Sequence, residues 1–383
     1  MKRWIAILIL VVLSIAAFVI WTRPPSATTP PQMTLLPSTE ESGFARAIDV
    51  IDFEFPRDHG PHPDFQTEWW YYTGNLNSAD GRHYGYQLTF FRRALAPGQT
   101  ERHASLATNQ IYFAHFALTD VERGTHREWE RFSRSSAGLA GAEIDPLRIW
   151  LENWSAEARD EQGQRIRLQA EVEGASLDLH LQAEKPIVAH GQNGLSPKSE
   201  EVGSASYYLS YTRMETQGEL SIEGERIPVR GASWFDHEWS TRALGPGVVG
   251  WDWFSLQFDD GRELMYFQIR REDGSVEPVS SGTLVEPDGS TMTFDSSAID
   301  IEVLDQWKSP ESGALYPGRW RISLPSAGVE VTVGPWLQDQ EMNVSFTYWE
   351  GAVRLQGESG GEPVEGVGYI ELTGYAESMQ GTF

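Results

Sequence analysis

The sequence predicts an all-β protein of two antiparallel β domains, preceded by an N-terminal hydrophobic helix. Short alternating runs such as "LSIEGERIPVRG" and "VEVTVGPW" are bounded by Gly, Asp, Asn or Pro, a pattern typical of antiparallel strands in a sandwich or barrel. Long stretches of helical periodicity are almost absent after the N-terminus. A chain of 383 residues also exceeds one small domain, so two domains are expected.

The first 23 residues are predicted to form a signal peptide or a signal anchor. Lys2 and Arg3 precede an uncharged apolar run, Trp4–Trp21, that is about as long as a membrane-spanning helix. The run lacks a clear cleavage site, which favours an anchor, and the basic residues before it place the rest of the chain outside the cytoplasm. We expect a periplasmic or otherwise extracytoplasmic protein anchored in the inner membrane, with the Pro/Ser/Thr-rich residues 24–44 as a tether.

Composition excludes several classes of function. A net charge of -25 without a basic cluster argues against nucleic-acid binding, because phosphates need positive counter-charge. The chain has no cysteine, so thiol catalysis, thiolate metal sites and disulfides are excluded. No G-x-S-x-G elbow, P-loop or dinucleotide fingerprint is present, and we expect no cofactor.

Two pairs of similar segments occur in the same order along the chain. "EWWYYTGNLNSADGRHYGYQLTFFRR" from Glu68 and "DWFSLQFDDGRELMYFQIRR" from Asp252 each predict a hairpin with a DGR turn, and both acids share parity with the apolar face. "RGASWFDHEW" and "EGVGYIELTGY" also match, with Asp236 aligned to Glu371. This order predicts a duplicated β domain, residues 45–243 followed by residues 244–383.

The segment "GASWFDHEWS" sets ionisable residues among aromatic ones. Asp236 or His237 falls on the inward face whichever way the strand is turned. A carboxyl enclosed by apolar walls has a raised pKa and can stay protonated near neutral pH, which suits an acid catalyst. The alternative is a structural strand whose polar groups satisfy buried backbone atoms or pair with arginines.

Glu68 and Asp252 each allow two interpretations, one functional and one structural. Each is a candidate for a ligand pocket, and each could instead form a structural ion pair with an arginine of its own hairpin, Arg92, Arg93, Arg270 or Arg271.

Histidines are the remaining candidates. His59 and His62 have a spacing that suits a metal, but no third ligand is apparent and the Pro/Gly-rich stretch indicates a surface loop, so no metal site is predicted. His115 lies in an aromatic strand and is expected to be a core histidine.

Four motifs together resemble the AttH-type, carotenoid 1,2-hydratase-like superfamily: "DHGPHPDFQTEWWYYTGNL", "GASWFDHEWS", "GWDWFSLQFDDGRELMYFQIR" and "YIELTGY". The similarity covers nearly all of the chain after the tether. It implies two lipocalin-like β-barrels packed together. Members of the superfamily include carotenoid hydratases, fungal cyclising enzymes and exported proteins associated with lipoprotein-type ABC transporters.

The resemblance also implies a chemistry. In the hydratases an acid protonates a terminal polyene double bond, aromatic faces stabilise the carbocation, and water adds. By resemblance the H-x-W of "DHEWS" carries over as His237 and Trp239, and Tyr266 matches a hydratase tyrosine. Gln268 stands where the hydratases are expected to have an acid, which leaves Asp252 or Asp236 as substitutes.

These observations predict that the protein binds a long hydrophobic ligand, an isoprenoid or a lipid, near the junction of its two domains. The predicted reaction is acid-catalysed hydration of an isoprenoid double bond, with Asp236, His237 and Asp252 as catalytic candidates. The candidate ligand-binding residues are Glu68, Trp69, Trp70, Tyr72, Trp234, Trp239, Trp251, Trp253, Tyr266 and Gln268. The alternative is a non-catalytic protein that passes a lipid or lipoprotein to a partner ABC transporter permease.

Overall fold

The computed structural model describes residues 43–98, 108–242, 244–245 and 247–379, which fall in one compact unit. The predicted N-terminal helix lies outside these residues, as does the tether except for its last two positions. None of the helices in the described part of the chain is long and apolar enough to cross a membrane.

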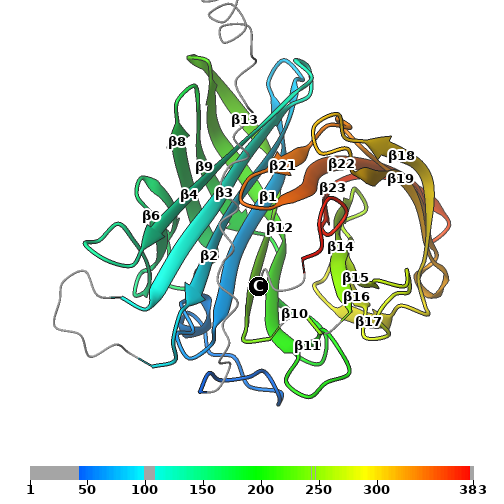
Figure 1. Ribbon diagram of the computed structural model, residues 1–383. Coiled ribbons are helices and arrows are strands. Elements are labelled where there is room, and N and C mark those ends of the chain that lie inside the picture. Colours follow the sequence, from blue (N-terminus) through cyan, green and yellow to red (C-terminus); the bar gives the residue numbers. More distant parts are fainter. Residues whose placement is uncertain (1–42, 99–107, 243, 246, 380–383) are drawn as a thin grey trace, which may run out of the picture. The chain divides into compact units, whose positions relative to one another are not determined.

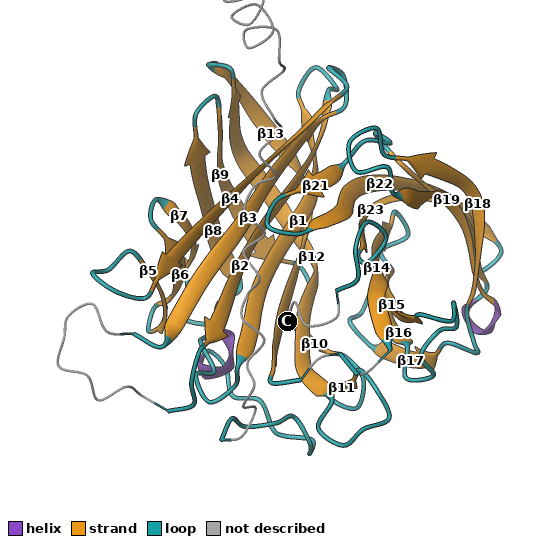
Figure 2. Ribbon diagram, in the orientation of Figure 1, coloured by secondary structure: helices purple, strands orange, loops and turns teal. Residues whose placement is uncertain are grey.

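The fold is all-β, as predicted, with two antiparallel sheets and two short 3-10 helices, η1 (Arg57–His59) and η2 (Pro325–Ala327) (Figure 2). Alternating apolar residues along each strand give every sheet one face that packs inward and one that faces outward. The 13-stranded first sheet comprises β1 (Thr67–Ser78), β2 (His83–Ala94), β3 (Gln110–Asp120), β4 (Thr125–Arg134), β5 (Ala140–Ile144), β6 (Leu147–Leu151), β7 (Trp154–Ala158), β8 (Arg165–Val172), β9 (Ala175–Ala183), β10 (Val188–Ala189), β11 (Leu195–Pro197), β12 (Ala205–Ile222) and β13 (Glu225–Ser240).

The first sheet curls into a nearly closed barrel (Figure 1). Its strands follow the order β4-β3-β2-β1-β13-β12-β9-β8-β7-β6-β5, with β10 and β11 added alongside β12. The interior is filled by a cluster of large side chains that includes Trp70, Tyr72, Phe116, Trp154 and Phe235. Residues before β1 pack through Phe53, Phe55 and Phe65 against Tyr207 and Trp239.

The 10-stranded second sheet is a half-barrel (Figure 1). Its path is β17-β16-β15-β14-β23-β22-β20-β19-β18, with β21 paired to β22. A second apolar cluster, containing Phe254, Tyr266, Trp320 and Trp349, fills its concave side. The strands are β14 (Val248–Phe258), β15 (Glu263–Arg271), β16 (Ser281–Val285), β17 (Thr291–Asp295), β18 (Asp300–Lys308), β19 (Leu315–Leu324), β20 (Val329–Pro335), β21 (Glu341–Asn343), β22 (Thr347–Ser359) and β23 (Glu362–Leu372).

The same local arrangement occurs in both sheets, in agreement with the repeated segments of the sequence. Hairpin β1/β2 pairs with β13, and hairpin β14/β15 pairs with β23. The outer faces of these strands carry Tyr71, Trp234, Trp253 and Tyr369, which form an apolar cluster between the two sheets. The alternation of side chains in β13 therefore determines which residues face the barrel interior and which face the second sheet.

Gly85 of β2 lies at a close approach of the two sheets. A Cβ atom at this position would lie 2.6 Å from the Cβ of Ala352 in β22. We expect Gly85→Ala to destabilise the protein by about 1–3 kcal/mol, because both backbones belong to packed sheets and cannot move apart cheaply. Urea unfolding measures the loss. Ala352→Gly in the same chain removes the clash and should restore most of the stability; an unchanged urea midpoint for Gly85→Ala alone would contradict this packing.

Candidate functional site

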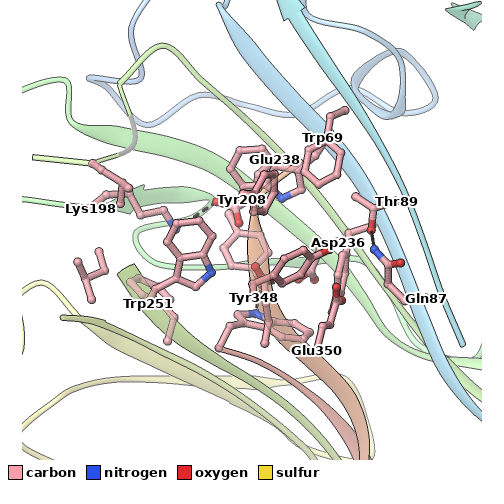
Figure 3. A pocket seen from close by; sticks show the side chains of 18 residues that line it. Trp69, Gln87, Thr89, Lys198, Tyr208, Asp236, Glu238, Trp251, Tyr348 and Glu350 are labelled. Atoms are coloured by element: carbon pink, nitrogen blue, oxygen red, sulfur yellow. Dashed lines mark hydrogen bonds and ion pairs between the residues drawn. The ribbon is translucent and has the colours of Figure 1, made fainter. Parts of the chain in front are cut away.

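A cavity of about 100 Å³ lies between the two sheets, and its wall combines aromatic rings with four carboxyl groups. Figure 3 shows Asp236, Glu238 and Glu350 among the rings of Tyr208, Trp251 and Tyr348. The lining residues are Trp69, Tyr71, Gln87, Thr89, Phe91, Lys198, Tyr208, Asp236, Glu238, Leu244, Trp251, Trp253, Phe267, Ile269, Phe346, Tyr348, Glu350 and Glu371.

Asp236 is the carboxyl group with the most complete set of neutral partners. Tyr208 Oη donates to Oδ2 at 2.7 Å, while Trp234 Nε1, at 2.6 Å, and the Ser210 hydroxyl donate to Oδ1. Burial raises the pKa of Asp236 to about 7 although these three donors oppose the shift. No ion pair joins Asp236 to a cationic side chain in the described part of the chain, so a large fraction of this acid is neutral near pH 7.

A line of polar groups continues from Asp236 into the protein. Ser210 Oγ lies 2.8 Å from His190 Nε2, and His190 Nδ1 lies 2.9 Å from the hydroxyl of Thr283. Burial, with a contribution from Lys198, lowers the pKa of His190 to about 3, so the imidazole is neutral. A neutral imidazole has one donor and one acceptor nitrogen, which allows Ser210 to relay a proton toward or away from Asp236.

Glu350 of β22 and Glu371 of β23 are direct partners across their strands. Both line the cavity, Glu350 buried and Glu371 partly buried, and Glu350 Oε1 has no hydrogen-bond partner among the described residues. Burial raises the pKa of Glu350 to about 8, and burial together with the neighbouring Glu350 raises the pKa of Glu371 well above its ordinary value. Two adjacent carboxyls in an apolar wall cannot both ionise cheaply, so this pair holds a proton near neutral pH.

Glu238 is the cavity acid that has a cation beside it. Lys198 Nζ lies 3.1 Å from its carboxylate and also sits 4.2 Å from the ring centre of Phe267, while the hydroxyl of Ser206 donates to Glu238 at 2.5 Å. Glu238 therefore differs from Asp236, Glu350 and Glu371, because it has a cation beside it, whereas burial raises the pKa of the other three.

His237 lies on the other face of β13 from Asp236, at the end of the first barrel. Its Nε2 lies 2.9 Å from Glu68 Oε1, and the same oxygen is 2.8 Å from His62 Nδ1. Burial would raise the pKa of Glu68, but Arg92 at 2.8 Å and the two histidines hold it well below its ordinary range. Burial lowers the pKa of His237, with Glu68 opposing the shift.

Aromatic rings enclose this second cluster. The indole of Trp239 stacks on His62 with ring centres 3.7 Å apart, and Trp70 stacks on His237 at 5.0 Å. Trp70 and Tyr72 belong to the barrel core, with the phenol ring of Tyr72 packed on Phe235.

Asp252 occupies a third location, on the concave side of the half-barrel. Arg270 donates to it at 2.9 Å, Gln268 at 2.7 Å and Tyr375 at 3.1 Å. Burial raises the pKa of Asp252, and Arg270 opposes the shift. The phenol ring of Tyr266 stacks on Phe294 in the core of the same sheet.

The three catalytic candidates from the sequence thus lie in three separate places. Asp236 reaches the cavity, together with the predicted ligand-binding residues Trp69, Trp251 and Trp253, and Trp234 binds Asp236 from beside it. His237 cannot assist Asp236 directly, because adjacent residues of a strand face opposite sides of the sheet. For Glu68 and Asp252 the structural alternative, an ion pair within the hairpin, is what the structure contains.

Sequence reasoning missed Glu350 and gave no role to Glu371. The signal for Glu371 was present, since the repeat aligns it with Asp236 and both line the cavity. Nothing in the sequence singled out Glu350, because it becomes a neighbour of Glu371 only when β22 pairs with β23 in this register.

The described chain thus combines an antiparallel barrel and a half-barrel with an acidic, aromatic cavity between them. The chain belongs to the AttH-like family, whose model matches residues 47–375, and the resemblance noted from the motifs is thereby confirmed. The crystal structure of an AttH protein from Nitrosomonas europaea is similar, with a TM-score of 0.77 and 34% identity, covering 87% of this chain and 100% of that chain.

Kievitone hydratases form a second group of similar proteins. That of Fusarium solani subsp. phaseoli is 22% identical over 215 residues, which are 54% of this chain and 59% of the relative, so the chain spans less than two thirds of that protein's length. The crystal structure of kievitone hydratase from Nectria haematococca has a TM-score of 0.66 at 16% identity, covering 88% of this chain and 97% of that chain, which shows a shared fold.

Proposed function

We propose that this protein adds water to a carbon–carbon double bond of an apolar ligand held between its two sheets, with Asp236 as the proton donor. One observation carries the proposal: a buried aspartic acid, with no cationic partner among the described residues and a pKa of about 7, at the wall of an aromatic cavity. The similarity to kievitone hydratase supports the reaction class.

The proposed steps use only groups at the cavity wall. Asp236 transfers its proton to one alkene carbon, and the other carbon becomes a carbocation facing the rings of Trp253 and Tyr208. A water molecule bonds to that carbon and gives its extra proton to the carboxylate that Asp236 has become. The product is an alcohol, and return of the proton to Asp236 restores the enzyme.

Cavity size restricts what can enter. A cavity of about 100 Å³ is smaller than the ~150 Å³ cavity that takes up benzene. We therefore propose that the branched end of an isoprenoid enters, while the rest of the ligand extends along the junction of the sheets.

A glutamine at position 268, where an acid was expected, is compatible with hydration. Its amide binds Asp252 inside the half-barrel and is not part of the cavity wall. The absence of an acid at this position therefore leaves the proposed role of Asp236 unaffected.

The cellular location and the domain organisation are also part of the proposal. We propose an exported protein held at the inner membrane by residues 1–23, with residues 45–243 and 244–383 as two related lipocalin-like domains. The alternative, a lipid-binding accessory of an ABC transporter permease, differs from it in one measurable respect, because it binds ligand without turnover.

Incubation with kievitone and with acyclic isoprenoids in ¹⁸O-labelled water tests the proposal. We expect a product that has gained one labelled water, detected by mass spectrometry. Because the acid must be protonated, kcat/KM should be constant below about pH 7 and fall about tenfold per pH unit above it. Ligand binding without any product would favour the accessory role, and a flat profile from pH 5 to 9 would remove Asp236 as the donor.

A further inference from the structure

We propose that His62, Glu68 and His237 form a binding site for a divalent transition metal, with zinc as the best match. The fold brings these residues together from the loop before β1, the start of β1 and the far end of β13. Each residue offers one ligand atom, and the three atoms lie within 4.8 Å of one another. The inference is independent of the proposed hydratase function, because the cluster lies on the opposite face of β13 from the cavity.

The donor set matches a known class of zinc site. Two imidazole nitrogens and one carboxylate oxygen bind zinc at about 2.0–2.2 Å, with a fourth position left for water or another ligand. Each histidine nitrogen is now 2.8–2.9 Å from Glu68 Oε1. A tetrahedral ion needs such atoms about 3.3 Å apart, so outward shifts of a few tenths of an ångström suffice.

Outer partners orient two of the three ligands. Asp58 Oδ1 lies 3.6 Å from His62 Nε2, the nitrogen that would remain free when Nδ1 binds a metal. Arg92 Nε and the backbone N–H of His62 donate to Glu68 Oε2 at 2.8 and 2.9 Å, while the same N–H lies 3.1 Å from Oε1, the oxygen that faces both imidazoles. A carboxylate behind a ligating histidine and a hydrogen bond to a ligating carboxylate are regular features of protein metal sites.

The location of the cluster gives the ion a structural effect. His62 belongs to a loop, and Glu68 and His237 belong to the barrel wall, so an ion bound by all three ties the loop to the barrel end. Without a metal the same groups form a hydrogen-bonded cluster around Glu68. The two states differ in metal content and in the stability gained from added metal, since an ion that binds only the folded chain stabilises it.

Measurements of metal binding by the full-length chain distinguish the metal site from the metal-free hydrogen-bonded cluster. After treatment with EDTA and removal of any affinity tag, we expect one equivalent of zinc to bind and to raise the melting temperature, and Co²⁺ to give the visible absorption of a tetrahedral site. His62→Ala should weaken zinc binding at least tenfold and abolish the thermal shift. His62 is suited to this test because its side chain is 18% exposed, whereas His237 is fully buried.

His180→Ala is the matched control, because His180 is an exposed histidine of β9 and should leave metal binding unchanged. Two results would overturn the proposal: no zinc retained by the wild-type chain at micromolar metal, or equal zinc binding by the wild-type and His62→Ala chains with a normally folded variant.

Discussion

Replacing Asp236 by asparagine is expected to lower the rate of double-bond hydration by about 10²–10⁴-fold, the usual contribution of a general acid. The substitution keeps the size of the side chain and one oxygen that can accept from Trp234, and its NH₂ group can donate to the Tyr208 hydroxyl, but an amide cannot supply the proton. Ligand affinity should change by less than about threefold. Turnover measured by product formation and binding measured by quenching of tryptophan fluorescence separate the two quantities.

The stability of Asp236→Asn provides an internal check on the environment of this acid. The folded-state pKa of Asp236 is about 7, above its ordinary 3.8, so ionisation costs the folded state progressively more stability between pH 4 and 7. Asparagine avoids that cost. The melting temperature of the variant relative to the wild type should therefore rise from pH 4 to 7 and then stay level.

Two further variants test whether Asp236 is the proton donor. Asp178→Asn changes a partly exposed acid on β9 that is paired with Arg167, and it should leave turnover unchanged. Asp252→Asn tests the other acid that the sequence singled out. Loss of turnover in Asp252→Asn with full turnover in Asp236→Asn would move the chemistry into the half-barrel and contradict the proposed mechanism.

The sequence predicted the fold class because its signals are local. Alternation of apolar residues and the DGR turns define the strands and hairpins, and parity correctly placed Glu68 and Asp252 on the apolar faces of their sheets. The half-barrel shape of the second sheet was not predicted. Whether a sheet closes depends on the twist and on how its edge strands pair, which no short segment specifies.

The candidate site was predictable only in part, for a related reason. Asp236 and its tryptophan neighbours stood out because acids rarely occur among aromatic residues. Grouping Asp236 with His237 and Asp252 was wrong in space: strand alternation separates the first two, and the third belongs to the other sheet. His62 was judged without a third ligand, since Glu68 and His237 become its neighbours only when β1 pairs with β13.

Arg92→Met is expected to cause the largest loss of stability among these variants, about 3–5 kcal/mol, because it leaves the buried carboxylate of Glu68 without its cation. The guanidinium also binds Gln110 Oε1 and the carbonyl oxygens of His62 and Phe65, at 2.8–2.9 Å. These bonds fasten the loop before β1 to the barrel. Urea unfolding followed by tryptophan fluorescence measures the loss.

If the loss of stability in Arg92→Met comes from the unpaired carboxylate of Glu68, a second variant should recover part of it. Glu68→Gln in the Arg92→Met background removes the stranded carboxylate, so the double variant should be more stable than Arg92→Met. Arg321→Met, which breaks an exposed pair with Glu302, should cost less than about 1 kcal/mol. A double variant no more stable than Arg92→Met would mean that the loop contacts of Arg92, rather than its charge, hold this end of the barrel together.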